Sequence, residues 1–245
     1  MSRANAVRYI DTAVLSLLSQ IRSDFRILAY DNHSTDGTFE RLLFWQKQDD
    51  CLCVSKPFSE HQGYVQLLNQ MLNDTTSDYV ARQDADDISL PHRLDVQYSF
   101  MEEKCGAVAC GTQGFNIIER EGGRISSDYP WESRYVNPVA SYNVPVNQAL
   151  KKWHRVIHGT LFGVRDAIRQ VGGYDEGLEP IEDWNLALDL SQIGDVYVLP
   201  QVCYLRRIHD DNISKNHPNK EKALQIIINR HNLNSEAQST RPNNL

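Results

Sequence analysis

The sequence predicts an α/β protein with a mainly parallel sheet that helices cover on both faces. Short apolar runs alternate along the chain with segments whose apolar residues recur at helical spacing, and polar turns separate the two. With 245 residues, the chain is long enough for one large domain with a substantial core. Ligands of such sheets bind beyond the carboxyl ends of the strands, so the polar turns that follow strands are the candidate binding loops.

The first half is predicted to open with a helix and a buried strand. Residues 6–21 place apolar side chains at the spacing of an amphipathic helix, and FRILAY (25–30) has the length and content of a buried parallel strand. The polar loop DNHSTDGT follows and can cap the next helix, which carries Phe39 and Leu42. Further strands are expected over 51–54, 78–83 and 107–110, and further helices over 63–72 and 91–104.

The second half is predicted to begin with a long loop over 119–143, because this stretch is rich in Gly, Ser, Pro and Tyr. Four helices are expected, over 146–153, 165–171, 181–193 and 221–230, and two extended stretches, over 158–164 and 196–208. The last dozen residues are rich in Asn, Ser and Gln and are expected to be disordered. We therefore expect one domain over 1–214 and a tail over 215–245.

Composition argues against several classes of protein. Twenty-five Lys and Arg against 32 Asp and Glu give a net charge of −7, and a chain without a basic block is a poor nucleic-acid binder. Apolar runs stay far short of a membrane span, and the first residues lack the pattern of a signal peptide. The five cysteines form neither CxxC pairs nor a zinc spacing, which predicts free thiols and a cytoplasmic protein.

The strongest local signal is Asp84-Ala85-Asp86-Asp87, directly after a predicted strand. Three carboxylates within four residues repel one another unless a cation or water lies between them. Oxygen ligands at this place suit Mg²⁺ or Mn²⁺, which usually keep waters and take phosphate oxygens as further ligands. The alternative is a solvated acidic turn ahead of the helix at Pro91, and the motif taken alone favours that alternative.

A second polar loop, Asp31 to Gly37, follows the first predicted strand. The Asp31 carboxylate and the Asn32 amide have the chemistry to contact a nucleobase or its ribose. Turn and cap chemistry explains Ser34 to Gly37 well, and it explains Asp31 least.

Glu182-Asp183-Trp184 opens a predicted helix after a Gly-rich turn. A carboxylate at a helix N-terminus stays ionised and can act as a general base, although acidic residues are common in any first turn. His209 follows the last predicted strand and could ligate a metal, but a lone loop histidine is more often simply solvated.

Read in order, three segments resemble the family-two inverting glycosyltransferases of the GT-A fold. They are LSLLSQIRSDFRILAYDNHSTDGT, YVARQDADDISLPHRLDVQ and HGTLFGVRDAIRQVGGYDEGLEPIEDWNLAL, and the similarity covers residues 4 to 214. Each motif is weak by itself, but their order and spacing are hard to obtain by chance. The resemblance implies a Rossmann-like, mainly parallel mixed sheet flanked by helices, with a nucleotide-sugar half over about 1–112 and an acceptor half over about 113–214.

The resemblance also implies roles. Asp31 and Asn32 would lie at the nucleobase of a nucleoside-diphosphate sugar, with a UDP-sugar as the first expectation. Asp84 and Asp86 would form the DxD motif, in which Asp86 binds Mn²⁺ or Mg²⁺ and Asp84 lies against the ribose or sugar; His209 would touch the metal or diphosphate. Asp183 would be the base that deprotonates the acceptor hydroxyl. The substrate-binding residues on the acceptor side would be Glu182, Trp184 and His158.

Three departures from the family pattern bear on these roles. Ala4-Asn5 resembles the end of the family's first strand-to-loop motif, so the first strand is expected to be missing or truncated. The second acidic residue on the base side is Asn32, a neutral group. Leu68 stands where many members have arginine, and Arg82 is expected to supply the charge that faces the phosphates instead.

The resemblance implies a metal-dependent transferase in cell-surface polysaccharide or glycolipid synthesis, with a saccharide or lipid-linked acceptor. The first alternative is a catalytically weakened GT-A domain that serves as a partner subunit, which the missing strand favours and the set of aspartates opposes. A nucleotidyltransferase or hydrolase is a further alternative, although the N-terminus lacks a Gly-rich phosphate loop. Peripheral contact with the cytoplasmic face of the inner membrane is left open; Lys151 to Arg155 form a small basic-aromatic patch that a solvated helix face explains equally well.

Overall fold

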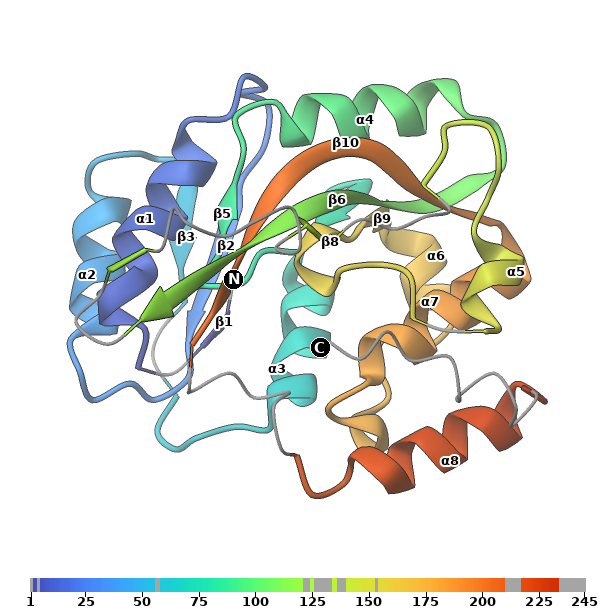
Figure 1. The fold of residues 1–245 in the computed structure, drawn as a ribbon. Coiled ribbons are helices and arrows are strands. Elements are labelled where there is room, and N and C mark those ends of the chain that lie inside the picture. The colour runs from blue at the N-terminus through green and yellow to red at the C-terminus, as the bar shows by residue number, and fades with distance from the viewer. Residues whose placement is uncertain are drawn as a thin grey trace.

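The computed structural model describes residues 2–3, 5–55, 58–120, 124–125, 134–135, 140–152, 154–209 and 217–233 (Figure 1). The helices are α1 (Val7–Leu18), α2 (Thr38–Gln46), α3 (Tyr64–Asp74), α4 (Arg93–Glu103), α5 (Asn147–Leu150), α6 (Arg165–Gln170), α7 (Glu182–Ile193) and α8 (Lys220–Arg230), with 3₁₀ turns η2 (His158–Thr160) and η3 (Glu176–Leu178). The strands are β1 (Ser2–Arg3), β2 (Ile27–Asp31), β3 (Leu52–Val54), β4 (Tyr79–Ala81), β5 (Ile88–Ser89), β6 (Ala107–Arg120), β7 (Arg124–Ile125), β8 (Arg134–Tyr135), β9 (Phe162–Val164) and β10 (Asp195–Ile208).

The strands form two hydrogen-bonded groups that lie next to each other. One is the parallel ribbon β1-β2-β3; the other has the order β4-β9-β6-β10-β5, with β7 and β8 paired to β6. The long strands β6 and β10 are parallel, whereas β9 is antiparallel to both β4 and β6. The predicted α/β fold with a mixed sheet flanked by helices is confirmed; β9 is one of the strands that make the sheet mixed, because it runs between β4 and β6 in the reverse direction.

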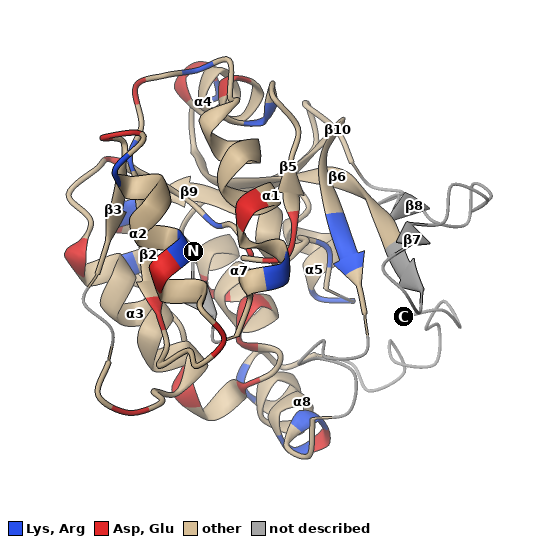
Figure 2. Ribbon diagram, turned by 90° about the vertical axis from the view of Figure 1, so that its left-hand side faces the viewer, with Lys and Arg blue, Asp and Glu red and all other residues tan. Residues whose placement is uncertain are grey.

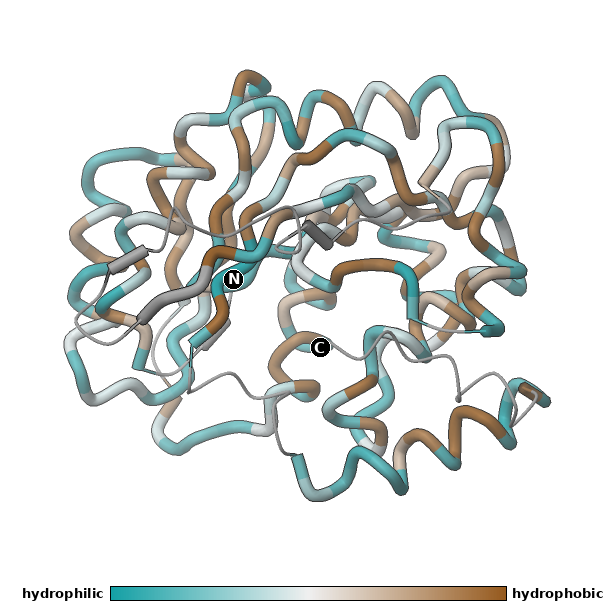
Figure 3. The backbone as a smooth tube through the Cα atoms, viewed as in Figure 1, coloured by the Kyte–Doolittle hydropathy of each residue, from teal (hydrophilic) through white to brown (hydrophobic). Residues whose placement is uncertain are grey.

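Helices cover both faces of the sheet (Figure 1). The side chains of β10 alternate between these two faces. Val196 and Val198 of β10 pack into the large core with α7, whereas Tyr197 and Leu199 pack against α4 on the opposite face. This period of two is the normal alternation of a strand. A third core joins α1 and α2 to β2 and β3. Figure 3 shows the hydropathy along the chain: hydrophobic residues are frequent in the helices and strands, and hydrophilic residues are frequent in the loops.

Several predicted elements differ from the observed ones in length or type. Of the predicted strand over 158–164, residues 158–160 form a 3₁₀ turn and only Phe162–Val164 is extended. A side chain at Gly159 would overlap Tyr204, since its Cβ would come within 2.2 Å of Oη, so this tight crossing requires glycine. The helix predicted over 146–153 is four residues long, and the strand predicted to end at residue 110 continues to 120, into the predicted loop.

The ends of the chain follow the sequence predictions in part. Ser2 and Arg3 pair in parallel with Tyr30 and Asp31, so a short piece of the strand expected to be missing or truncated is present. The predicted helix over 221–230 is confirmed, while the last dozen residues lie outside the described part of the chain, as do most of 119–143 and Trp153. All five cysteines are free thiols.

Charge is distributed without a dominant sign on the face that Figure 2 shows, where α1, α4 and α8 each carry basic and acidic residues. Within the described ranges, every helix is too short or too polar to cross a bilayer.

Candidate active site

The first candidate residues lie at the end of β2. The side chain of Asp31 is buried; its Oδ2 accepts the backbone N–H of Ser34 at 3.0 Å, and its Oδ1 is buried without a hydrogen-bond partner among the described atoms. Asn32 uses both ends of its amide on Gln62, whose carbonyl accepts at 3.0 Å and whose backbone N–H donates at 2.8 Å. Asn32 therefore fixes the loop ahead of α3, and Asp31 keeps one acceptor oxygen that a ligand could use.

The acidic loop 84–87 follows β4, at the same edge of the sheet as Asp31. Its aspartates point in different directions. Asp84 accepts from the guanidinium of Arg82 at 2.7 Å, and its backbone N–H donates to Tyr204 Oη at 3.3 Å. Asp87 is turned into the fold, where its Oδ1 accepts the backbone N–H of Arg207 at 2.7 Å. Burial, together with Asp84 and Asp86, raises the pKa of Asp87.

Asp86 faces the end of β10. Its Oδ2 lies 2.9 Å from Nε2 of His209, and its backbone carbonyl accepts from Nε of Arg207 at 2.9 Å. The ring of His209 stacks on Tyr9 of α1 with a centroid distance of 5.1 Å, which fixes the orientation of the imidazole. Asp86 and His209 are thus brought together although 122 residues separate them in the sequence.

Arg82 is buried rather than open to solvent. It donates to Tyr64 Oη at 2.6 Å as well as to Asp84, and its Nε has no hydrogen-bond partner in the described structure. Burial alone would lower the pKa of the guanidinium, but Asp84 and Tyr64 hold it well above its usual range. Arg82 therefore brings a fixed positive charge to the acidic loop and orients Asp84.

A second buried arginine, Arg93 of α4, stabilises the acidic loop 84–87. Arg93 of α4 is fully buried and donates to neutral oxygens: the Gln97 side chain at 3.0 Å, the Ser89 hydroxyl at 2.8 Å and the Arg82 carbonyl at 2.7 Å. It also reaches the side chain of Gln83 at 3.1 Å. These contacts hold both stems of the acidic loop on α4.

The other candidate carboxylates open α7. Asp183 Oδ1 accepts the backbone N–H of Trp184 at 2.8 Å, and its Oδ2 lies 3.3 Å from Nε2 of His154. Trp184 points into the core, where its indole N–H donates to the Leu150 carbonyl at 2.9 Å. Trp184 thus anchors the start of α7, and Asp183 is the partly exposed member of the carboxylate pair.

Glu182 is almost fully buried beside His158 and Tyr174. Its Oε1 lies 4.0 Å from Nδ1 of His158, whose Nε2 contacts Tyr174 Oη at 3.0 Å. Burial and then the charge of Asp183 raise the pKa of Glu182 to about 8, so Glu182 is protonated at neutral pH. Burial, Arg82 and His154 hold the pKa of His158 well below its usual range, so its imidazole is neutral.

Two tyrosines join the acidic loop to the start of α7. Burial raises the pKa of Tyr64, and both Asp84 and Glu182 raise it further against the opposing charge of Arg82. Burial likewise raises the pKa of Tyr174, and Glu182 raises it further against the opposing charge of Arg82. Asp84 and the Glu182–Asp183 pair are therefore close enough to act electrostatically on the same tyrosine. Sequence reasoning missed both tyrosines and the place of His154, because only the fold brings them there.

The donor set suits a divalent cation that is shared with a ligand. Asp86 and His209 offer a carboxylate and an imidazole side by side, whereas Asp84 is turned to Arg82. Mn²⁺ accepts an imidazole ligand more readily than Mg²⁺ does. Within the described residues, groups of three or more His, Cys, Asp or Glu close enough to hold a metal by themselves are absent. Because these cations usually keep waters and bind phosphate oxygens, a partial protein set fits a cation bridged to a diphosphate.

An α/β sheet with aspartates at the ends of two strands and a carboxylate pair at a helix N-terminus is the arrangement expected of a GT-A domain. The sequence profile of glycosyl transferase family 2 matches residues 4–171. The chain belongs to this family, as the motifs predict.

Comparison with known proteins agrees with this assignment. An uncharacterized glycosyltransferase of Haemophilus influenzae is 25% identical over 226 residues, which are 91% of this chain and 69% of that protein. A chondroitin synthase of Pasteurella multocida is 23% identical over 96% of this chain, but the match spans only 23% of the synthase.

Solved structures share the fold. Staphylococcus aureus TarS in complex with UDP-GlcNAc matches with a TM-score of 0.74 and 16% identity, over 92% of this chain and 63% of that one. A mannosyltransferase from Pyrobaculum calidifontis, in complex with GDP-Man and Mn²⁺, matches with a TM-score of 0.64 and 18% identity, over 99% of this chain and 63% of that one.

Proposed function

We propose that this protein is a metal-dependent inverting glycosyltransferase. It moves a sugar from a nucleoside-diphosphate sugar, a UDP-sugar first, to a hydroxyl of a saccharide or lipid-linked acceptor in cell-surface polysaccharide or glycolipid synthesis, in the cytoplasm. The observation that carries the proposal is that Asp84 acts on the same two tyrosines, Tyr64 and Tyr174, as the carboxyl groups at the start of α7. The names of the relatives support the substrate class, since they include a chondroitin synthase and structures with UDP-GlcNAc and GDP-Man.

On the donor side, each residue has a definite task. The unpartnered oxygen of Asp31 accepts a hydrogen bond from the nucleobase or ribose, and Asn32 keeps the neighbouring loop in place. Asp84, oriented by Arg82, contacts the ribose or sugar. Asp86 and His209 hold Mn²⁺ or Mg²⁺, which when bound neutralises the diphosphate and makes it a better leaving group.

On the acceptor side, Asp183 accepts the proton of the attacking hydroxyl. Its Oδ1 is held by the Trp184 N–H, and its Oδ2 is the oxygen that remains for the proton, next to His154. A protonated Glu182 beside it relieves the repulsion between adjacent carboxyl groups, and with His158 it forms the floor of the acceptor pocket. An inverting transfer needs only this one base, because the leaving diphosphate needs no acid.

The weakened partner subunit is not favoured, because Asp84 and the Glu182–Asp183 pair act on the same tyrosine and Asp31 retains an acceptor oxygen. A hydrolase differs from a transferase in releasing sugar to water without an acceptor, so measuring sugar release from the donor in the absence of any acceptor separates the two.

The first test is a screen of UDP-, GDP- and dTDP-sugars for thermal stabilisation in the presence and absence of Mn²⁺. A ligand that binds only the folded state raises its stability. Stabilisation by at least one nucleotide sugar that depends on Mn²⁺ is expected. No stabilisation by any of them, with folded protein and Mn²⁺ present, would refute donor binding.

Variants then separate the roles. Asp183→Asn keeps the contact with the Trp184 N–H but cannot accept a proton, so transfer should fall by about 10²–10⁴-fold while donor affinity stays within about twofold. Asp86→Asn should weaken Mn²⁺ and donor binding together. Asp166→Asn, which also changes an acidic first-turn residue of a helix, is the matched control and should leave both unchanged. Asp183→Asn with normal transfer, or with donor binding as poor as that of Asp86→Asn, contradicts the assignment.

A further inference from the structure

Two residues at the end of β10 hold the acidic loop 84–87 at Asp86. Nε2 of His209 lies 2.9 Å from Oδ2 of Asp86, and Nε of Arg207 donates to the Asp86 carbonyl at 2.9 Å. The backbone N–H of Arg207 also donates to Asp87 at 2.7 Å. Asp86 is therefore fixed both at its carboxylate and at its backbone by residues that lie two positions apart in the sequence.

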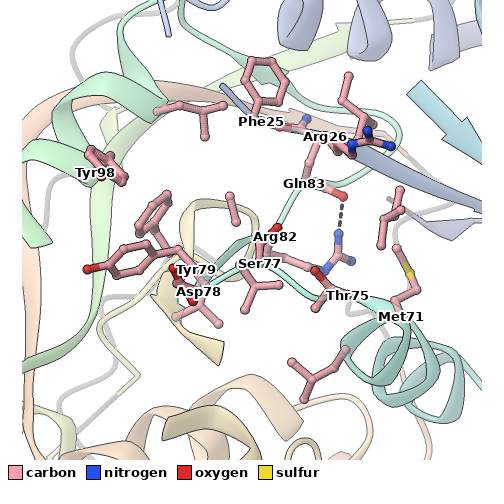
Figure 4. A pocket seen from close by; sticks show the side chains of 18 of the residues that line it. Phe25, Arg26, Met71, Thr75, Ser77, Asp78, Tyr79, Arg82, Gln83 and Tyr98 are labelled. Atoms are coloured by element: carbon pink, nitrogen blue, oxygen red, sulfur yellow. Dashed lines mark hydrogen bonds between the residues drawn. The ribbon is translucent and has the colours of Figure 1, made fainter. Parts of the chain in front are cut away.

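Packing against this loop is incomplete on another side. Its stem, Arg82 and Gln83, lines a cavity of about 540 Å³ between β2 and β4, and Figure 4 shows both side chains in the wall of that cavity. Side chains that border a cavity have fewer atoms in contact with them. The loop therefore depends on its contacts with α4, through Arg93, and on its contacts with the end of β10.

An aromatic ring of α1, that of Tyr9, contacts both of these β10 side chains. It stacks on the imidazole of His209 with a centroid distance of 5.1 Å and an interplanar angle of 26°. The guanidinium carbon of Arg207 lies 4.9 Å from the centroid of the same ring. Tyr9 is only 8% exposed, so protein atoms hold the ring in place against its two partners.

The start of α1 is anchored to the loop that follows β2. The backbone N–H of Ala6 donates to Thr38 Oγ1 at 2.8 Å, and that of Val7 donates to Asp36 Oδ2 at 3.0 Å. These bonds satisfy donors that the first turn of a helix leaves without partners. Tyr9, in this first turn, therefore has a backbone as well as a ring that is fixed by its surroundings.

The ring of Tyr9 has the chemistry to favour a cation at His209. An aromatic face attracts a positive charge within about 6 Å of its centroid. An imidazole that ligates a divalent cation becomes more positive, so a stacked ring stabilises the metal-bound imidazole more than the free one. A ring that holds the imidazole in one orientation also lowers the ordering cost of binding.

We propose that Tyr9 is a positioning residue of the metal site, whose ring holds His209 against Asp86 and thereby raises the affinity of the site for Mn²⁺. The proposal rests on the metal-binding role that the proposed function gives to Asp86 and His209. Groups that orient a metal ligand typically change metal affinity by about 10–100-fold. An aliphatic side chain at position 9 fills space but offers no π face, whereas phenylalanine keeps the stacked ring.

The test measures Mn²⁺ binding to the whole chain, without donor or acceptor, from the loss of the EPR signal of the free ion. Tyr9→Leu should raise the Kd for Mn²⁺ by roughly tenfold, while Tyr9→Phe should keep it within about twofold. Tyr98→Leu is the matched control, because the ring of Tyr98 also faces a guanidinium, that of Arg22 at 3.4 Å, and it should leave the Kd unchanged. Tyr9→Met is a second aliphatic variant with the expectation of Tyr9→Leu, for use if the leucine variant does not fold.

Proton NMR gives a readout that needs no metal. A stacked aromatic ring shifts the imidazole C–H signals of His209, and this shift should persist in Tyr9→Phe and disappear in Tyr9→Leu. A Kd of the aliphatic variants equal to that of the unchanged chain would overturn the positioning role, and so would equal losses in Tyr9→Phe and Tyr9→Leu. Absent Mn²⁺ binding in the unchanged chain, or binding that Asp86→Asn leaves intact, would instead refute the metal site of the proposed function, and this proposal with it.

Discussion

Replacing Glu182 by glutamine should make the protein more stable at alkaline pH. Glu182 is 3% exposed at the start of α7, where burial and the neighbouring Asp183 raise its pKa from the ordinary 4.5 to about 8. The folded state therefore binds this proton more tightly than the unfolded state does. The resulting stability is fully present below pH 4.5 and is lost as the pH rises through 8.

The size of the effect follows from the same pKa. One pKa unit corresponds to about 1.4 kcal/mol, so the loss between pH 4.5 and pH 9 is at most about 5 kcal/mol, and charge relaxation around Asp183 reduces it to a few kcal/mol. Glutamine has the same shape and carries no proton to lose. The variant should match the parent near pH 5 and exceed its free energy of unfolding by about 2–4 kcal/mol at pH 9.

Urea unfolding followed by tryptophan fluorescence, from pH 5 to pH 9, measures the difference between the two proteins. Glu176→Gln, at an exposed position in η3, is the matched control and should give a flat difference curve. Other titrating groups are common to both proteins and cancel in the comparison. Parallel curves for parent and Glu182→Gln over this range would refute the view that Glu182 is protonated and buried at neutral pH.

Three further outcomes are expected. Gly159→Ala should lower the free energy of unfolding by about 1–3 kcal/mol, because the new Cβ would come within 2.2 Å of Tyr204 Oη. Gly63→Ala is the control and should change the free energy of unfolding little, because the nearest atom to its new Cβ would lie at 3.7 Å. Urea unfolding compares the two variants. Tyr204→Phe removes the acceptor of the Asp84 N–H and should cost about 1 kcal/mol by the same measurement, with no loss contradicting that contact. Chelation with EDTA should abolish turnover and added Mn²⁺ should restore it, and full turnover after exhaustive chelation would remove Asp86 from its metal-binding role.

The order of elements was predictable because hydrophobic periodicity dominates it. The apolar runs that became β2 and β10 and the helical spacing of α1 and α7 are strong local signals. The lengths of the elements were less predictable. The composition of residues 158–160 favours an extended strand, but the crossing of Gly159 over Tyr204 makes them a tight turn. The reversed direction of β9, which makes the sheet mixed, is a tertiary property that no local pattern encodes.

For the site, the sequence indicated residues that lie directly after strands or at a helix start. Asp31, Asp84 and Asp86 stand where strands end, and Asp183 stands in a first turn. Tyr174 could not be found in this way, because in GGYDEG it has the context of a turn residue and its partner His158 belongs to another element. Arg82 could be found but not its environment, since only the fold buries it against Tyr64.

The buried guanidinium of Arg93 has a consequence for the reaction cycle. In the proposed function, the acidic loop must keep its shape after the cation and the diphosphate have left, although its carboxylates then repel one another. Arg93 places a buried guanidinium next to this loop, and its bonds to Ser89 and the Arg82 carbonyl tie the loop to α4. A loop held in this way before a donor arrives would need little binding energy for ordering in each turnover.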